Sequence, residues 1–308
     1  MTKKWKKAIA LSLAALTLTG ALAGCGDDKK AASGAAKPAA GQTIKINFPT
    51  AGASGALYAV GAAITNMWSS QVPGVQASSQ ASAGGIANLN MVSEGEAQVS
   101  IAISSNVYQC LNGTDSFKDH AYKDLKAIGG LYLNPNQVVA TANSGINSLK
   151  DVKGKHFAVA SAGSSVYNEC ETHFTAAGLS FPDDIKAEYI TFTDAADMLQ
   201  NGSIDGAWIM SGAPASAVTQ ALTGGAHLVE IDDNLIKELK AKYPWYTSYT
   251  IKAGTYPNQD KDVKTSAIKM VMFCRGDLPE DVVYQLTKTL WEHMDELGQS
   301  QKNLKGLT

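Results

Sequence analysis

Short β-type runs alternate with amphipathic helical runs along the chain from Thr43 onward. Ile44, Ile46 and Phe48 alternate as in a half-buried strand, and the apolar residues between Leu57 and Met67 then recur at helical spacing. This alternation is typical of a parallel or mixed sheet that is covered by helices. We therefore expect an α/β fold rather than an all-helical or all-β one.

The alternation of strands and helices continues along the chain. Further strands are expected at 75–77, 99–103, 127–133, 137–142, 157–160, 187–190, 206–210 and 269–274, and helices near 86–95, 165–177, 194–201, 214–222 and 279–297. An extended stretch at 127–142 and a turn at 254–258 predict two crossings between two lobes. The first lobe would comprise 43–130 plus 252–308 and the second 131–251, with a natural ligand cleft between them.

The first residues are typical of an export signal. Four lysines precede an apolar stretch at 8–23, which ends in Ala23-Gly24-Cys25. This pattern resembles a bacterial lipobox, so residues 1–24 are predicted to be a lipoprotein signal peptide and Cys25 to carry the lipid. Residues 25–42 are poor in apolar bulk and are predicted to form a flexible tether. A weak transmembrane anchor with an incidental cysteine is the alternative.

The charge balance excludes one large class of partner. The chain has 308 residues, with 26 basic and 28 acidic side chains and no basic stripe interleaved with aromatic residues, so nucleic-acid binding is not expected. Arg275 is the only arginine. Because arginine is the usual bidentate partner of carboxylates, an anionic ligand must be held largely by other groups. Three further cysteines, Cys110, Cys170 and Cys274, leave one disulfide possible and are assigned no chemistry.

Small polar residues fill the junctions between predicted strands and the helices that follow them. Five junctions share this character: 50–55, 80–85, 104–106, 161–165 and 210–214. Each offers backbone N–H groups, hydroxyls and a helix start at the carboxyl end of a strand, where open α/β sheets bind ligands. The same residue types are also ordinary in turns and N-caps, and this remains the alternative for any single junction.

Motifs of enzymes are missing from the sequence. It contains no Walker A loop, GxGxxG, HExxH or GxSxG, and the SxxK match at Ser266–Lys269 enters a strand instead of opening a helix. Five scattered histidines are expected at the surface or at helix ends: His120, His156, His173, His227 and His293. We expect a binding protein with no enzymatic activity, metal or cofactor.

Several of these segments together resemble a known family. They are Thr50-x-Gly52-x-Ser54-x-x-x-Tyr58, Ser82-x-Gly84-Gly85-x-x-Asn88 and the run at 253–260. This order, followed over about 43–297, resembles the TAXI family, the substrate-binding proteins of tripartite ATP-independent periplasmic (TRAP) transporters. The resemblance implies a two-lobed periplasmic-binding-protein fold of type II character, with a cleft that closes on a small carboxylate such as glutamate, a 2-oxo acid or a dicarboxylate. The loaded protein, an extracytoplasmic and lipid-anchored monomer, would deliver this ligand to an ion-gradient-driven TRAP permease.

The junctions and the resemblance together give a set of expected ligand-binding residues. They are Thr50, Ser54, Tyr58, Ser82, Gly84, Asn88, Asn106, Gly163, Ser164, Ser165, Gly212, Ala213 and Tyr256. Backbone N–H groups and hydroxyls would take the carboxylate, and the two tyrosines would form apolar walls with a polar tip. Arg275 is expected to form a structural ion pair with Asp277, with ligand contact as the alternative.

Two departures from the family pattern bear on the ligand. Ser104-Ser105-Asn106 stands where the family commonly has Gln-Ser-Asp, which favours a ligand without an ammonium group. Gly163-Ser164-Ser165-Val166 replaces Gly-Ser-Gly-Thr, so the pocket shape differs. Glu169 could supply a replacement acid, although an exposed first-turn glutamate is the commoner explanation. A ligand-binding subunit of a sensor system and an extracytoplasmic hydrolase are the alternative functions.

Overall fold

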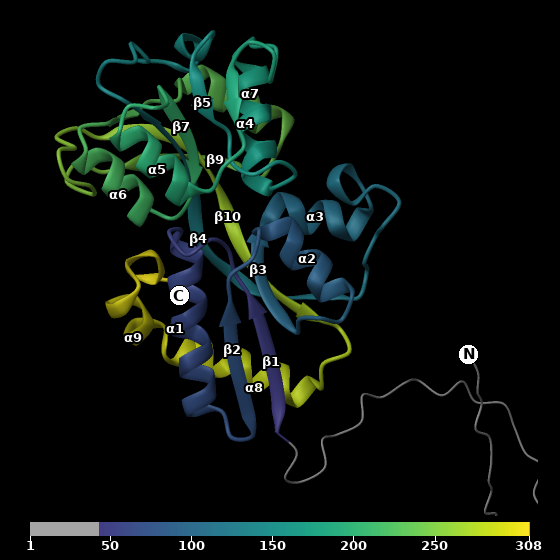
Figure 1. Cartoon of the computed structure of the whole chain (residues 1–308). Helices are drawn as coiled ribbons and strands as arrows, with labels where there is room; N and C mark the ends of the chain where they lie inside the picture. The colour runs from purple at the N-terminus through teal and green to yellow at the C-terminus, as the bar shows by residue number, and fades with distance from the viewer. Residues whose placement is uncertain (1–42, 308) are drawn as a thin grey trace, which may run out of the picture. The chain divides into compact units, whose positions relative to one another are not determined.

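The computed structural model describes residues 43–307 (Figure 1). The predicted signal peptide, the lipidation site at Cys25 and the tether lie outside these residues. The strands are β1 (Ile44–Pro49), β2 (Val75–Gln80), β3 (Val99–Ile103), β4 (Leu125–Ala140), β5 (His156–Ala158), β6 (Lys186–Glu188), β7 (Gly206–Met210), β8 (His227–Val229), β9 (Tyr246–Ile251) and β10 (Val263–Arg275). The α-helices are α1 (Ala56–Gln71), α2 (Gly85–Ser93), α3 (Ser104–Asn112), α4 (Ser165–Ala176), α5 (Phe192–Gln200), α6 (Ser216–Thr223), α7 (Asp233–Lys242), α8 (Glu280–Glu292) and α9 (Met294–Ser300). Short 3-10 turns lie at Asp115–Phe117, Leu149–Val152 and Lys302–Leu304.

Two long strands, β4 and β10, connect the parts of the sheet. The strand order is β3-β10-β4-β7-β5-β6, with β9 paired to β10 and β8 paired to β4, while β1 and β2 form a separate parallel pair. β10 runs antiparallel to β3 and β4, whereas β5 is parallel to β6 and β7. The α/β fold with a mixed sheet is therefore confirmed.

Figure 1 shows two groups of elements joined by β4 and β10. The first lobe contains β1–β3, α1–α3, α8 and α9, and the second lobe contains β5–β9 and α4–α7. The expected first crossing lies within β4, a single continuous strand that includes Pro135. The turn at 254–258 stays against the second lobe, where Asn258 Nδ2 donates to Leu222 O at 3.1 Å, and the chain returns along β10. The residue boundaries of the lobes stay a prediction.

Apolar faces at helical spacing build the core of each lobe. In α1, Val60, Ile64 and Trp68 are fully buried, and the Trp68 ring lies 6.0 Å from that of Phe48 in β1. Trp68 also donates from Nε1 to Leu286 O of α8 at 2.9 Å, so the buried indole is satisfied. In the second lobe, one cluster consists of smaller side chains from β7 and α6, mainly Ala, Val, Ile and Leu, and another buries the large rings of Phe157, Phe174 and Trp208. These contacts fix the ends of the strands that face the cleft.

The structure differs from the predicted elements at several places. The helix expected at 279–297 is divided into α8 and α9 at His293, whose backbone leaves the helical region (φ −107°, ψ 13°). Helix α3 begins directly at Ser104, where a turn was expected, and α7, β8 and β9 were not predicted. Cys110, Cys170 and Cys274 are buried and free. Within residues 43–307, no helix has the length and apolar character needed to cross a membrane.

Candidate functional site

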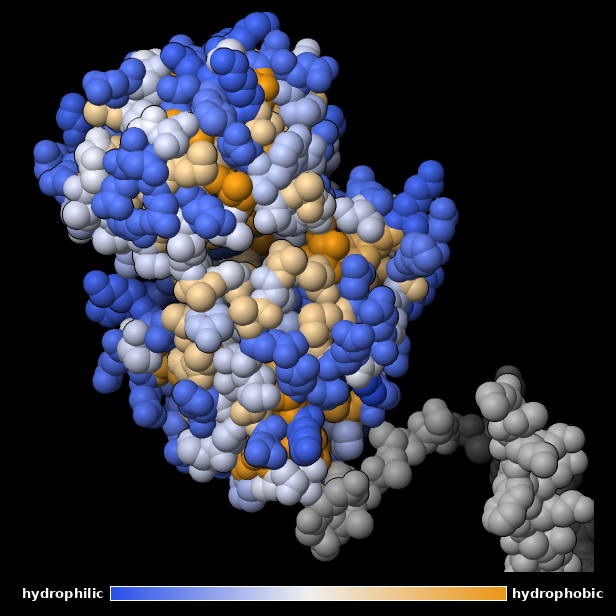
Figure 2. Space-filling model, viewed as in Figure 1, coloured by the Kyte–Doolittle hydropathy of each residue, from blue (hydrophilic) through white to orange (hydrophobic). Residues whose placement is uncertain are grey.

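A cavity of ≈ 410 Å³ lies where the two lobes meet, and Figure 2 shows a recess on this part of the surface. The junctions after β1, β2, β5, β6 and β7 contribute to it, together with the end of β3 and the middle of β4 and of β10. The lining residues are Ala51–Gly55, Leu57, Ser82–Gly85, Ala102, Ile103, Asn134, Ala160, Ser161, Ser164–Val166, Ile190–Thr193, Met210, Ser211 and Met270. We call this space the first cavity.

The lining of the first cavity carries no charged side chain. Helices α2, α4 and α5 each begin in this lining, at Gly85, Ser165 and Phe192, so three helix N-termini face the cavity. Helix N-termini present free N–H groups and a positive partial charge, and these favour an anion. Most of the remaining wall is apolar. The arrangement suits a small organic acid with an apolar body, and offers no general base or nucleophile with an activating partner.

Five of the predicted site residues line the first cavity. They are Ser54, Ser82, Gly84, Ser164 and Ser165. The Ser164 hydroxyl caps α4 by accepting from Tyr167 N at 3.1 Å. The Ser82 hydroxyl lies 2.9 Å from Thr50 O and accepts from Gly84 N at 3.0 Å, which shapes the loop before α2.

Two further predicted residues hold this loop from behind. Thr50 and Asn88 are fully buried, and Asn88 Nδ2 donates to Thr50 O at 2.7 Å and to Ile101 O at 3.1 Å. Asn88 Oδ1 also lies 2.6 Å from the Ser82 hydroxyl. These side chains tie the ends of β1, β3 and α2 together and position Ser82 without reaching the cavity themselves.

The structure places the other predicted residues elsewhere. Tyr58 is 36% exposed on the outside of α1, and Tyr256 is buried, accepting from Ala215 N at 3.1 Å and donating to Gln137 Oε1 at 2.5 Å. Neither tyrosine forms a wall of the first cavity, because one points outward and the other fixes the start of α6. Gly163, Gly212 and Ala213 also lie outside the lining, and Asn106 faces a second cavity described below.

Residues outside the predicted set join the lobes at the edge of the cavity, although one of them, Ser211, belongs to the predicted junction 210–214. Ser211 Oγ accepts from Ala56 N at 3.0 Å. On the same side, Thr193 Oγ1 donates to Ser54 Oγ at 3.0 Å and Ser216 Oγ donates to Ser54 O at 2.7 Å. Thr193 belongs to a further junction, Thr191-Phe192-Thr193, which leads from β6 into α5 and differs from the five predicted junctions in containing a large aromatic residue. No local sequence pattern indicated that Phe192 and Met270 form apolar walls of the first cavity.

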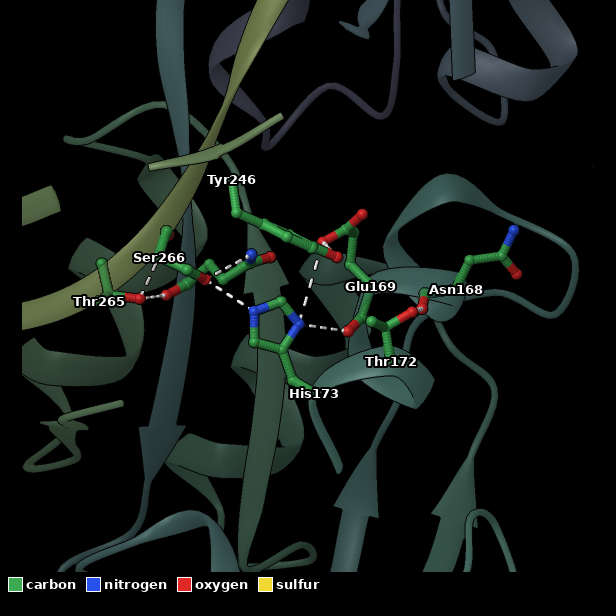
Figure 3. Close-up of polar contacts among 8 residues, drawn as sticks. Asn168, Glu169, Thr172, His173, Tyr246, Thr265 and Ser266 are labelled. Atoms are coloured by element: carbon green, nitrogen blue, oxygen red, sulfur yellow. Dashed lines mark hydrogen bonds and ion pairs between the residues drawn. The ribbon is translucent and has the colours of Figure 1, made fainter. Parts of the chain in front are cut away.

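A second cavity of ≈ 320 Å³ adjoins the first and shares Ser165 with it. Glu169 lines it, and Tyr246 OH donates to Glu169 Oε2 at 2.8 Å (Figure 3). The expectation of an exposed first-turn glutamate was wrong: Glu169 is only 5% exposed, because α4 turns this face toward β9 and α3. Burial raises the pKa of its carboxyl to about 7, partly offset by the hydrogen bond from Tyr246.

His173, one turn further along α4, corrects the expectation of surface histidines. Its ring is fully buried, with Nδ1 2.7 Å from Glu169 O and Nε2 2.7 Å from Ser266 Oγ. Burial lowers the imidazole pKa to about 4. Although Ser266, His173 and Glu169 resemble a hydrolytic triad in composition, Nδ1 bonds a backbone carbonyl and lies 3.9 Å from the Glu169 carboxylate. Ser266 is also buried in β10 and reaches neither cavity, so the group is a structural network.

Arg275 forms the expected ion pair. Its Nε donates to Asp277 Oδ1 at 2.8 Å, and Nη1 donates to Gly95 O at 3.0 Å. These contacts tie the end of β10 to the turn after α2. Arg275 lines neither cavity.

The comparisons with known proteins agree with this geometry. The sequence model of the NMT1-like family matches residues 48–308. The chain belongs to the NMT1-like family. Solved structures similar to this NMT1-like protein include the periplasmic binding protein BugD, with 15% identity over 84% of this chain and 86% of that one and a TM-score of 0.56. The substrate-binding protein of an amino acid ABC transporter has 15% identity over 84% and 99% of the two chains and a TM-score of 0.51.

The alkanesulfonate-binding protein SsuA from Xanthomonas axonopodis pv. citri, bound to MOPS, is also similar. It shares 17% identity over 85% of this chain and 74% of that one, with a TM-score of 0.50. At such identities the likeness shows the fold alone. The NMT1-like protein therefore has the two-lobed fold of periplasmic solute-binding proteins.

Proposed function

We propose that this protein is an extracytoplasmic solute-binding protein that captures a small organic acid in the first cavity. The observation that carries the proposal is the cavity itself, which lies between two lobes of a periplasmic-binding fold and has three helix N-termini and no charged side chain in its lining. A carboxylate can be held there by backbone N–H groups and hydroxyls, while the apolar walls enclose the rest of the molecule.

The ligand-binding residues that we propose lie in this lining or directly behind it. Ser54, Ser82, Gly84, Ser164 and Ser165 would contact the ligand, and Thr50 and Asn88 would hold the loop that carries Ser82. Ser54 also accepts hydrogen bonds from the second lobe, so ligand contact and lobe closure share one residue. Closure would then bury the ligand and form the surface that a membrane partner recognises.

The proposals for the ligand, the permease and the lipid anchor depend on the sequence resemblance to the TAXI family. We propose a TAXI-type protein that hands glutamate, a 2-oxo acid or a dicarboxylate to an ion-gradient-driven TRAP permease, and that is anchored to the membrane through a lipid on Cys25. The lining supports a carboxylate, and the coarse family and fold are compatible with this assignment. Mass spectrometry of the mature N-terminus tests the lipid on Cys25, and uptake measurements with and without the permease test delivery.

Calorimetric titration of the full chain with amino acids, 2-oxo acids and dicarboxylates tests the proposed function. We expect one-to-one binding without turnover. Ala83 is exposed in the lining, so the variant Ala83→Leu fills part of the first cavity. Ala59→Leu, on the exposed face of α1, is a matched control. Overfilling a binding site by three carbons costs about 1–3 kcal/mol, so Ala83→Leu is expected to weaken binding about tenfold or more and the control to leave it unchanged. Equal affinities in both variants would place the ligand elsewhere.

A further inference from the structure

The second cavity is acidic, in contrast to the first. It lies between α3 of the first lobe and α4 and the start of β9 in the second lobe, and Asp115, Glu169 and Glu171 are among its lining residues. No lysine or arginine lines it. The aromatic side chains of Tyr243, Trp245 and Tyr246 form one wall. Aromatic rings and acidic side chains in one lining are suited to bind an organic cation.

Three buried polar atoms in this lining have no hydrogen-bond partner: Ser105 Oγ, Asn106 Oδ1 and Ser165 Oγ. Their residues are 3%, 3% and 4% exposed, and an unsatisfied polar group at such burial is costly. Asn106 Nδ2 already donates to Gln109 Oε1 at 3.0 Å, so the remaining atom of the amide, Oδ1, can only accept. The group missing at Asn106 Oδ1 is therefore a donor, which a carboxylate could not supply, whereas the hydroxyls of Ser105 and Ser165 can donate or accept.

Glu169 adds a buried acid without a charged partner. Its carboxyl accepts from Tyr246 OH at 2.8 Å, and a side-chain hydrogen bond with Asn136 also lowers its pKa. Among residues 43–307, the only ion-pairing group within 4.0 Å is the His173 ring, 3.9 Å away. Because burial keeps that imidazole neutral at physiological pH, it does not compensate a carboxylate. At the aromatic wall, Lys242 Nζ lies 5.1 Å from the Tyr243 ring centroid.

We propose that the second cavity binds a primary ammonium group, with Glu169 and Asn106 Oδ1 as its acceptors. An ammonium group has three donors and no acceptor, so it matches a lining of orphaned oxygens and an unpaired carboxylate. The two cavities share Ser165. If the proposed function holds, one ligand can place its carboxylate in the first cavity and its ammonium group in the second.

The test uses a probe that needs no carboxylate. Calorimetric titration of the full chain compares 3-methylbutylammonium with 3-methylbutan-1-ol, which has the same body and no charge. We expect the ammonium compound to bind at least about tenfold more tightly, and Glu169→Gln to remove that preference. The amide of this variant keeps an acceptor for Tyr246, so the fold is preserved. Glu96→Gln, at an exposed residue outside both cavities, is the matched control and should bind like the unaltered chain.

The pH dependence gives a second readout. The titratable groups that face Glu169 are Asp115 and Glu171 in the lining, Tyr243 and Tyr246 on the wall, and His173 behind it. Affinity for the ammonium probe should fall as the pH drops below about 7, because Glu169 is then protonated, and Glu169→Gln should flatten this profile. Equal binding of amine and alcohol, no amine binding, or an unaffected Glu169→Gln variant would overturn the proposal. Carboxylate binding sensitive to Ala83→Leu could persist in each case, so failure here is distinct from failure of the proposed function.

Discussion

The His173 imidazole and the Ser266 hydroxyl lie 2.7 Å apart and join α4 to the long strand β10 (Figure 3). Ser266 Oγ accepts from Asn136 Nδ2 at 3.0 Å, so its own proton is free to be donated to His173 Nε2. Nδ1, 2.7 Å from Glu169 O, then carries the ring proton. Both nitrogens of a neutral imidazole are satisfied in this way, whereas a protonated ring would lose the bond from Ser266.

This network predicts an unusual dependence of stability on pH. The pKa of His173 is about 4 in the fold and near 6.5 when unfolded, so its contribution to stability is present above 6.5 and is lost as the pH falls toward 4. The pKa of Glu169 is about 7 in the fold and near 4.5 when unfolded, so its contribution is present below 4.5 and is lost as the pH rises toward 7. Each contribution to the free energy of unfolding amounts to roughly 3 kcal/mol. Between pH 4.5 and 6.5 the two contributions change in opposite directions with pH.

Two single variants separate the contributions of His173 and Glu169 to the pH dependence of stability. With His173→Gln, acidification from about pH 7 to 4.5 should raise the free energy of unfolding relative to the unaltered chain, because only the Glu169 contribution remains. With Glu169→Gln, the same acidification should lower it. Urea denaturation at a series of pH values measures both. Parallel pH profiles for the two variants would contradict the assigned pKa shifts.

Ser211→Ala should weaken the contact between the lobes. The substitution removes the acceptor of the buried Ala56 N–H at the start of α1. Leaving a buried donor unsatisfied costs about 1–3 kcal/mol, and part of this loss should appear as weaker ligand binding, because Ser211 lines the first cavity. Urea denaturation and calorimetry measure the two effects. Ser203→Ala, at an exposed serine outside the lining of both cavities, is the control.

Tyr256→Phe should lower stability and leave ligand affinity unchanged. The hydroxyl of Tyr256 satisfies Ala215 N and Gln137 Oε1, and removing it orphans both buried groups at a cost of about 1–3 kcal/mol. Since Tyr256 does not line either cavity, the dissociation constant should stay within about twofold of the original. A large loss of affinity would restore this tyrosine to the ligand site.

Arg275→Lys should have a small and purely structural effect. A lysine keeps the charge but cannot donate to both Asp277 and Gly95 O with a rigid fork, which predicts a loss of about 1 kcal/mol in the free energy of unfolding. Ligand affinity should not change, because the side chain lies outside both cavities. Reduced affinity with unchanged stability would make Arg275 a ligand contact.

Local patterns in the sequence predicted the elements whose apolar residues repeat regularly. β3 and β7 have the predicted bounds, and the start of α4 at Ser165 follows from its serine cap. The predictions from local patterns were wrong where contacts with other elements determine the structure. The apolar pattern over 279–297 predicted one helix. In the structure the helix is interrupted at His293, and α9 contacts α1. Two extended runs were expected at 127–133 and 137–142, but β4 is one continuous strand over both.

By itself, the sequence determined the α/β fold and the small-residue junctions, because hydrophobic period and turn chemistry are local properties. Only the tertiary structure decided which junction residues face the first cavity, since the direction of a side chain depends on how its strand and helix are packed. Tyr58 and Tyr256 were selected by type, yet one points to solvent and the other is buried beneath the cleft. Glu169 and Asn106 lie 63 residues apart, and the tertiary arrangement of α4 and α3 places both in the lining of one cavity. Burial, which no local pattern reports, then gives Glu169 its raised pKa.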